Sequence, residues 1–308
     1  MARRHGLAGE LRDGPIGDAE RHRSGERRLR RVPCTDGLCG WRQYGVTMLE
    51  LDKIHCGDNC DLLGQLPREC VDLVVTSPPY DDLRTYGGHS WDFFGVAWQL
   101  TRVLKPGGVL VWVVADATKD GSETGTSMEQ ALHFKRLGLN LHDTMIYKQA
   151  GTGAKGSNLA YWQAWEYMLV ISNGTPKTVN RLADRANLCA GATVAGNSGK
   201  MNVLGSRTER GPRDVPEFSV RQNVWEYAAH DGSGTNHPAP FHFSLARDHI
   251  ATWSNPGDLV LDPFSGSGTT AKAAKELGRR FLGLEINPEY CAIAERRIAQ
   301  QVLELEAV

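Results

Sequence analysis

The clearest chemical signal in the sequence is a glycine-rich turn followed, 19 residues after its first glycine, by a glutamate. Gly266, Gly268 and Ala271 fit the form Gly-x-Gly-x-x-Gly/Ala, and Glu285 ends the apolar run that comes next. Small residues let backbone amides at a helix N-terminus approach a ligand, and a carboxylate accepts hydrogen bonds from ribose hydroxyls. The pattern therefore predicts a cofactor that contains adenosine. NAD, FAD and S-adenosylmethionine all satisfy it.

A second set of residues with chemical potential is the corner Ser77-Pro78-Pro79-Tyr80, which directly follows an apolar run at 71–76. Each proline has a restricted φ and no N–H, so the two prolines hold the backbone rigid at this point. Taken alone, the corner is also compatible with a strand that ends in a stiff turn and a core tyrosine. A chemical role for the corner can be inferred only when it is considered together with the glycine-rich turn.

Together the two motifs resemble those of the amino-directed DNA methyltransferases, which methylate exocyclic nitrogens of cytosine or adenine. "DPFSGSGTT" (262–270) is similar to the family's S-adenosylmethionine motif, and "TSPPY" (76–80) to its catalytic motif, Asp/Asn/Ser-Pro-Pro-Tyr/Phe/Trp. The resemblance covers about 48–299. The catalytic motif precedes the cofactor motif, as in the family's circularly permuted β group. Further similar segments are "CGDNCDLL" (56–63), "LKPGGVLVW" (104–112), "WEYMLVIS" (165–172) and "HPAPFHFSLARDHI" (237–250).

The resemblance implies a role for each residue of the corner. The lone pair of a base amino group is delocalised into the ring, so an enzyme must reorient it toward the methyl donor. Ser77 Oγ and the Pro78 carbonyl would accept the two amino hydrogens, and Pro79 would help to hold both acceptors in place. Tyr80 would stack on the base once it is flipped out of the duplex. No metal and no covalent intermediate is expected. Asp81 and Asp82 are interpreted as structural or solvated.

The resemblance also implies which residues bind the cofactor. Asp262 and the loop that follows would surround it, Glu285 would hold the ribose, and Asp58 would reach its adenine side. His237, with Pro238, would close over the methionine end. The complete predicted set is Asp58, His237, Asp262, Pro263, Phe264, Ser265, Gly266, Ser267, Gly268, Thr269, Thr270, Glu285 and Asn287. For Asp58 a simple turn, and for His237 an exposed helix start, remain alternatives.

Residues 175–222 lose the apolar periodicity and carry eight lysines and arginines against four acids. We expect this basic, irregular insertion to recognise the target sequence, because lysine and arginine bind phosphates and guanine edges. The predicted DNA-binding residues are Lys177, Arg181, Arg185, Lys200, Arg207, Arg210, Arg213 and Arg221. Each of them is also compatible with a solvated surface charge.

Three functions therefore compete. The first is a site-specific DNA methyltransferase acting on N4 of cytosine in duplex DNA, favoured over N6 of adenine because cytosine enzymes of the family commonly carry serine at the position of Ser77. The second is a non-catalytic DNA-binding protein built on this fold, which the intact corner and loop argue against. The third is a nicotinamide dehydrogenase, which would leave Ser77 to Tyr80 without a role.

Short apolar runs alternate with amphipathic stretches after Met48, a pattern that favours an α/β fold with a largely parallel, twisted sheet and helices on both faces. We predict strands at 71–76, 109–116, 141–148 and 167–172, and helices at 91–104 and from Ser127, where Ser127 and Gln130 resemble a capping box. Regular alternation returns near 223–228. The resemblance implies a Rossmann-like methyltransferase fold in which both motifs lie at the carboxyl ends of neighbouring parallel strands.

Four segments are expected along the chain. Residues 1–47, with ten arginines against six acids, look like a disordered arm, and Met48 is a candidate natural start. A catalytic half (48–174), the recognition insertion (175–222) and a cofactor half (223–308) follow. The formal net charge of the whole chain is only -1, because acidic residues elsewhere balance these basic segments. No apolar run approaches the roughly 20 residues that span a bilayer. The seven cysteines show no Cys-x-x-Cys spacing, which argues against a disulfide framework or zinc site.

We therefore expect a cytoplasmic protein, encoded by a prokaryote or a phage, that uses S-adenosylmethionine and no metal. Its partner would be double-stranded DNA, and a membrane partner is not expected. A cognate restriction endonuclease and a homodimer are left open, as is the recognition sequence.

Overall fold

A computed structural model of the chain describes residues 49–79, 91–150, 161–195, 198–201, 207–209, 211–228 and 242–305, with the backbone alone at 198–201, 207–209 and 300–305. The predicted arm, 1–47, lies outside the described residues. The helices are α1 (Asn59–Gly64), α2 (Phe93–Val103), α3 (Thr126–Arg136), α4 (Phe243–Trp253), α5 (Thr269–Glu276) and α6 (Pro288–Leu305). The strands of the main sheet are β1 (Lys53–Cys56), β2 (Val71–Thr76), β3 (Leu104–Val114), β6 (Asn140–Ala150), β7 (Trp165–Ser172), β14 (Val224–Ala228), β15 (Leu259–Asp262) and β16 (Arg280–Glu285).

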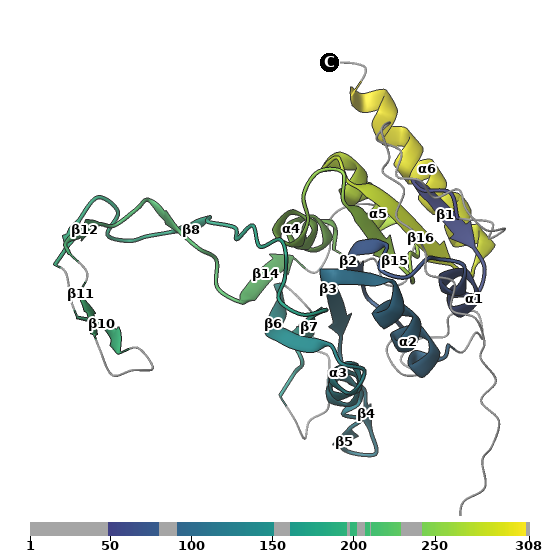
Figure 1. The fold of residues 1–308 in the computed structure, drawn as a ribbon, viewed down its shortest axis with the longest axis horizontal. Coiled ribbons are helices and arrows are strands. Elements are labelled where there is room, and N and C mark those ends of the chain that lie inside the picture. Colours follow the sequence, from purple (N-terminus) through teal and green to yellow (C-terminus); the bar gives the residue numbers. More distant parts are fainter. Residues whose placement is uncertain are drawn as a thin grey trace, which may run out of the picture. The chain divides into compact units, whose positions relative to one another are not determined.

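The main sheet has the strand order β1-β16-β15-β2-β3-β7-β6-β14 (Figure 1). Every neighbouring pair is parallel except the two that involve β7, which runs antiparallel to both β3 and β6. The predicted, largely parallel sheet is thus confirmed. The strand pairing β15–β2, with Val260 opposite Leu73, brings the cofactor half beside the catalytic half although nearly 190 residues separate them.

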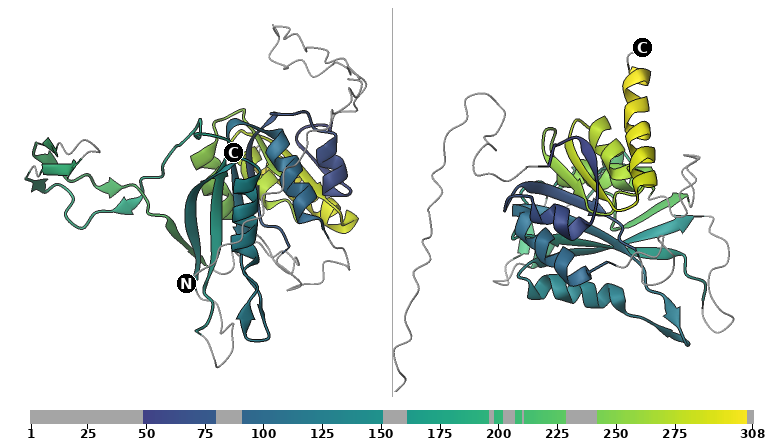
Figure 2. Two further views of the ribbon diagram at one scale, coloured as in Figure 1. Left: turned by 60° about the horizontal axis from the view of Figure 1, so that its bottom comes forward. Right: turned by 90° about the vertical axis from the view of Figure 1, so that its right-hand side faces the viewer.

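Helices cover both faces of the sheet, as Figure 2 shows in two further views. Val75, Val111 and Met168 belong to one core cluster together with apolar side chains of α4, α5 and α6. Val74, Trp112 and Leu169, which alternate with them along the strands, belong to a second cluster with side chains of α1, α2 and α3. Alternate strand residues point to opposite faces, so two helix layers enclose the sheet as expected from the sequence.

The predicted capping box at the start of α3 is wrong. The helix begins at Thr126, its N-cap is Gly125, and no side chain caps it. Ser127 lies inside the first turn, where its backbone N–H and its hydroxyl donate to Asp116, at 2.8 and 2.5 Å. Gln130 accepts instead from Trp112 Nε1 at 2.8 Å. Both polar side chains are buried and bond to β3 and the residues just after it, which a local sequence pattern does not reveal.

The basic insertion is more regular than predicted, because its two halves pair with each other. β8 (Arg185–Ala186) pairs with β13 (Phe218–Ser219), β9 (Thr193–Val194) with β12 (Arg213–Asp214), and β10 (Ser198–Met201) with β11 (Arg207–Glu209), all antiparallel. The three nested pairs are separate two-stranded sheets that follow one another along the insertion as an interrupted antiparallel ribbon. A further short pair, β4 (Thr118–Lys119) with β5 (Ser122–Glu123), follows β3.

Candidate active site

The catalytic corner and the cofactor loop lie at the same edge of the sheet. β2 ends at Thr76 and leads into Ser77, while its parallel neighbour β15 ends at Asp262 and leads into the glycine-rich loop. Thr76 Oγ1 donates to Asp262 Oδ1 at 2.6 Å, and Thr270 Oγ1 donates to the Val75 carbonyl at 3.2 Å. The expectation that both motifs follow neighbouring parallel strands is therefore confirmed. Two side-chain hydrogen bonds hold them together.

The loop itself is shaped by two glycines in the left-handed region, Gly266 at φ 50° and Gly268 at φ 79°. Gly268 N–H donates to the Ser265 carbonyl at 2.8 Å, and Gly268 is the N-cap of α5, which no side chain caps. The first backbone amides of α5 are therefore not taken by a capping side chain, and the positive end of the helix is directed into the loop. This arrangement suits a ligand with anionic or acceptor groups.

Glu285 fixes the shape of the loop from the end of β16. Its Oε2 accepts the Gly266 N–H at 2.8 Å and its Oε1 accepts the Asn287 N–H at 2.9 Å. The side chain is half-buried, and a carboxylate is a group that accepts hydrogen bonds from ribose hydroxyls. Asn287 Oδ1 in turn accepts the Glu289 N–H at 2.8 Å, so Asn287 caps the start of α6.

Asp58 also reaches this region. Its Oδ1 accepts the Asp61 N–H at 3.1 Å and so caps α1, which agrees with the turn alternative for this residue. The preceding Gly57 donates to the Glu285 carbonyl at 2.9 Å. The next residue, Asn59, donates through Nδ2 to the Pro263 carbonyl at 3.3 Å. The start of α1 is thus attached to the cofactor loop, although the sequence analysis did not single out Asn59.

The serines and threonines of the loop are mostly buried and supported from α6. Arg297 Nη1 donates to the backbone carbonyl and to the hydroxyl of Ser267, both at 2.7 Å, and contacts Thr269 Oγ1 at 3.4 Å. Among the described residues, the buried Ser265 Oγ has no hydrogen-bond partner. A Cβ added at Gly283 would lie 2.5 Å from this oxygen, so the hydroxyl is directed toward β16 beneath the loop.

Phe264 of the cofactor loop belongs to an aromatic group with residues of β3 and of the segment before α2. Its ring centroid is 4.8 Å from that of Trp91 and 6.2 Å from that of Trp112, in edge-on geometry. Trp112 is fully buried in β3, whereas Trp91 is half-buried just before α2. The sequence analysis missed Trp91, and no spacing within the chain links it to Phe264.

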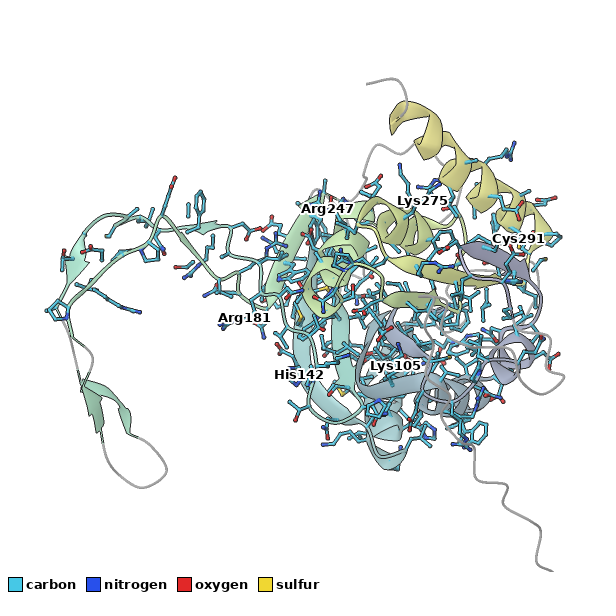
Figure 3. All side chains as sticks on the ribbon, turned by 45° about the horizontal axis from the view of Figure 1, so that its top comes forward. Lys105, His142, Arg181, Arg247, Lys275 and Cys291 are labelled. Carbon is cyan, nitrogen blue, oxygen red and sulfur yellow. The ribbon has the colours of Figure 1, made fainter. Side chains whose placement is uncertain are left out.

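The corner is described as far as Pro79, with Pro78 buried and with Ser77 and Pro79 half-buried. Tyr80, His237 and Pro238 lie outside the described residues, as do Asp81 and Asp82. Among the eight basic side chains predicted to bind DNA, Lys177, Arg181, Arg185 and Arg213 are exposed (Figure 3 labels Arg181). Lys200 and Arg207 are described by their backbone alone, and Arg210 lies outside the described part. Arg221 is half-buried in an ion-pair cluster.

Asp262 carries the most perturbed carboxyl of the site. Burial raises its pKa from 3.8 to about 6, although hydrogen bonds from Thr76 and Thr270 lower it. Because the folded-state pKa lies above the unfolded one, the associated stability is fully present below pH 3.8 and is lost as the pH rises through about 6. Two pKa units correspond to about 3 kcal/mol in the free energy of unfolding.

We therefore expect an Asp262→Asn variant to gain stability relative to wild type, by about 3 kcal/mol, between pH 4 and pH 7. The asparagine keeps an oxygen that can accept from Thr76 but does not ionise. Denaturant unfolding of both proteins across this pH range measures the difference directly. A difference that does not change with pH would show that the carboxyl titrates alike in the folded and unfolded chains.

No described helix is both long and apolar enough to cross a membrane. No group of three or more His, Cys, Asp or Glu side chains gathers in the described part of the chain as a set of metal ligands.

Comparison with known proteins adds to this geometry. A family model described as DNA methylase, covering enzymes that act on N6 and N4 amino groups, matches residues 71–296. The orphan methyltransferase M.BamHII of Bacillus amyloliquefaciens is 48% identical over 242 residues, which cover 76% of this chain and 90% of M.BamHII.

Two solved structures share the fold. A putative DNA modification methylase of Thermus thermophilus, TTHA0409, in complex with S-adenosyl-L-methionine, is 26% identical with a TM-score of 0.54. The match covers 81% of this chain and 95% of that one. The cytosine-N4-specific PvuII DNA methyltransferase is 19% identical with a TM-score of 0.58, over 79% and 85% of the two chains. The second likeness shows the fold alone.

Proposed function

Because the chain belongs to the DNA methylase family, whose members use S-adenosylmethionine, we propose that it methylates N4 of cytosine at a specific site in duplex DNA. The observation that carries the proposal is the position of Ser77, directly after β2 and beside the cofactor loop that follows β15. Serine before the two prolines is the residue that favours cytosine over adenine. The target base leaves the duplex by flipping, as its amino group is inaccessible in the stack.

When bound, S-adenosylmethionine would supply an electrophilic methyl group and leave as S-adenosylhomocysteine, and the methylated amino group would release one proton to water. Ser77 Oγ and the Pro78 carbonyl accept the two hydrogens of the base amino group and so turn its lone pair toward that methyl. The oxygens of the corner also stabilise the positive charge that develops on the nitrogen. Pro78 and Pro79 keep the acceptors in place without a donor of their own, and Tyr80 stacks on the flipped base.

The residues of the loop fit the cofactor on their own geometry. Gly266 and Gly268 bring the amides of α5 forward, and the Glu285 carboxylate, which accepts the Gly266 N–H, would hold the ribose hydroxyls. Asp58 lies at the adenine side. The remaining loop residues, Asp262, Pro263, Phe264, Ser267, Thr269 and Thr270, together with Asn287, hold this shape through the contacts described above.

The basic ribbon between β7 and β14 is proposed to recognise the target sequence. The major groove admits a two-stranded β-ribbon, and each strand of this one carries exposed positive charge, as at Arg185 and Arg213. Phosphate contacts by Lys177 and Arg181, at the start of the insertion, would add affinity without sequence information.

The bacterial relative supports a place in the cytoplasm, where the DNA lies. The homodimer and a cognate endonuclease stay open.

One experiment tests both levels of the proposal. The protein is incubated with DNA and S-adenosylmethionine, the DNA is digested to nucleosides, and the methylated base is identified by mass spectrometry. We expect N4-methylcytosine. N6-methyladenine would keep the family and overturn the choice of base, whereas no methylated base with a cofactor-bound protein would leave a non-catalytic DNA-binding protein as the better interpretation.

A further inference from the structure

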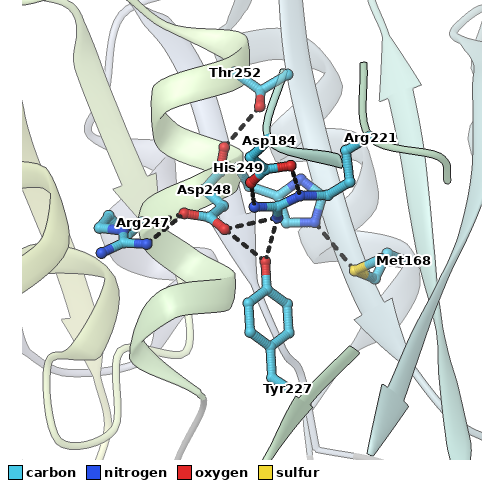
Figure 4. A network of polar contacts seen from close by, with 8 residues as sticks. All are labelled: Met168, Asp184, Arg221, Tyr227, Arg247, Asp248, His249 and Thr252. Atoms are coloured by element: carbon cyan, nitrogen blue, oxygen red, sulfur yellow. Dashed lines mark hydrogen bonds and ion pairs between the residues drawn. The ribbon is translucent and has the colours of Figure 1, made fainter. Parts of the chain in front are cut away.

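Arg221 stands at the end of the basic insertion, but its guanidinium is directed into the protein (Figure 4). Nη1 donates to Asp248 Oδ2 at 2.8 Å and to the Tyr227 hydroxyl at 2.9 Å. Nε donates to Asp184 Oδ1 at 3.0 Å, and Nη2 pairs with the other oxygen of the same carboxylate. The guanidinium carbon also lies 4.9 Å from the centre of the Trp225 ring. Four of the five N–H donors of an arginine are thus used inside the protein.

The partners of Arg221 are matched to its charge. The Asp248 side chain is only 7% exposed; its Oδ2 pairs with Arg221 at 2.8 Å and its Oδ1 with Arg247 at 3.0 Å. Tyr227 donates its hydroxyl hydrogen to Asp248 Oδ2 at 2.7 Å, and burial with the nearby Asp248 charge raises the pKa of the phenol. Hydrogen bonding to Arg221 lowers the pKa of Asp184. We call Asp184, Arg221, Tyr227 and Asp248 the Arg221 cluster.

This cluster joins both ends of the insertion to α4. Asp184 lies near the beginning of the insertion and Arg221 at its end, and Asp248 is in the middle of α4. The Arg221 N–H also donates to the Leu182 carbonyl at 2.8 Å, which closes the ribbon at its base. A second attachment lies at the C-terminal end of the same helix, where Asn180 N–H donates to the Thr252 carbonyl at 2.8 Å and Nδ2 to the Ser254 carbonyl at 3.2 Å.

The helix that receives the insertion also packs against the cofactor helix. Leu245, Ala246 and Ile250 of α4 share one core cluster with Ala271 and Ala274 of α5. Lys272 Nζ of α5 lies 5.2 Å from the centre of the Phe243 ring at the start of α4. The N-cap of α5, Gly268, belongs to the cofactor loop. One helix therefore lies between the insertion and the elements that hold the cofactor.

We propose that Arg221 is a positioning residue that, with Asp184 and Asp248, fixes the recognition insertion on α4, and is not itself a DNA contact. The inference rests on the proposed role of the insertion in recognising DNA. DNA held by the ribbon is kept in register with the catalytic corner through α4. The loss of the Arg221 cluster lets the ribbon turn about its base, so that fewer encounters with DNA place a base in reach of Ser77.

Salt dependence separates a positioning residue from a phosphate contact. Each phosphate that a protein neutralises contributes about -0.9 to the slope of log K against log salt concentration. A positioning arginine contributes nothing to that slope. Lysine also distinguishes the two roles, because it retains the charge needed at a phosphate but cannot reproduce the forked geometry that pairs with two carboxylates.

The experiment compares Arg221→Ala, Arg221→Lys and Asp184→Asn with wild type, and Arg181→Ala is the contrasting variant at an exposed arginine of the same insertion. Asp184→Asn weakens the cluster from its more exposed side and leaves no buried carboxylate without a partner. The quantities measured are the KM for DNA, the salt slope of DNA binding, and the Kd for S-adenosylmethionine. A general loss of folding would weaken cofactor and DNA binding together.

We expect all three cluster variants to raise the KM for DNA about tenfold, with the wild-type salt slope and a Kd for S-adenosylmethionine within twofold of wild type. The Arg221→Ala/Asp184→Asn double variant should be no worse than the worse single variant, because both changes remove the same attachment. A salt slope reduced by about 1 in Arg221→Ala, with full activity in Arg221→Lys and Asp184→Asn, would overturn the inference. An unchanged salt slope in Arg181→Ala would instead count against the proposed DNA-binding role of that exposed residue.

Discussion

A Ser77→Ala variant is expected to transfer methyl groups to DNA about 100-fold more slowly than wild type at saturating substrates, while its Kd for S-adenosylmethionine stays within twofold. The alanine removes one of the two acceptors that turn the amino lone pair toward the methyl donor. The second acceptor, the Pro78 carbonyl, belongs to the backbone and remains. Single-turnover measurement with radiolabelled methyl donor and cognate DNA gives the rate of the chemical step, and a direct binding titration gives the cofactor affinity.

Two comparisons make the Ser77 result specific. Ser77→Asp restores an oxygen acceptor at the same backbone position, and aspartate is one of the residues that the family's catalytic motif allows at this position. We expect it to recover part of the lost rate, with a shift toward adenine detectable in the nucleoside digest. Ser122→Ala, at an exposed serine of β5, is the control for an unrelated loss of a hydroxyl. A Ser77→Ala rate equal to that of Ser122→Ala would remove Ser77 from the mechanism.

The parts of the site that the sequence predicts are those whose geometry is local. Gly266, Gly268 and Glu285 lie in one unit of about 30 residues that consists of a strand, a turn, a helix and a second strand. The hydrogen bonds from Gly266 to Glu285 and from Gly268 to Ser265 are both formed inside that unit. The neighbourhood of β2 and β15 is also predictable, since parallel strands that carry ligand-binding loops end at one edge of a sheet. A catalytic role for the serine and prolines of the corner can be inferred because they lie at that edge, beside the cofactor loop.

The parts that the sequence does not predict depend on partners far along the chain. Arg221 has the charge and surroundings of a DNA-binding residue, and only the fold places Asp184 and Asp248 around it, 37 and 27 residues away. Ser127 has the spacing of a cap, yet Asp116 binds it from the end of β3. Trp91 meets Phe264 across the two halves of the permuted domain. The charge of a residue and its spacing from other residues can be read from the sequence. The side chains that it binds in the fold cannot.

The predicted arm and Tyr80 lie outside the described residues, so their interpretation stays a prediction. The domain boundaries are likewise proposals. The attachment of the insertion to α4 gives them a physical meaning, since Asn180 and Arg221 lie close to the expected ends at 175 and 222. Hydrogen bonds and ion pairs with α4 define the two ends of the insertion more directly than the loss of apolar periodicity does.

The second large effect is expected from Gly268→Ala at the start of α5. Gly268 has φ +79°, where an alanine is strained, and an added Cβ would lie 2.8 Å from Ala294 Cβ and 3.2 Å from Ala294 Cα of α6. The left-handed strain costs about 1 kcal/mol and the overpacking a further 1–3 kcal/mol, roughly, in the free energy of unfolding. Because the same residue brings the α5 amides toward the cofactor, the Kd for S-adenosylmethionine should rise at least tenfold.

Gly278→Ala is the matched control for this change, because it isolates the strain from the contact. Gly278 lies just after the same helix at φ +70°, and an added Cβ there would meet no atom of the described residues within 4 Å. We expect a loss of only about 1 kcal/mol and an unchanged Kd. A Gly268→Ala/Ala294→Gly double variant removes the nearest atom and should recover most of the overpacking cost. Thermal or denaturant unfolding and a cofactor titration measure all three proteins. If Gly268→Ala is no more damaging than Gly278→Ala, close contact with α6 does not shape the loop.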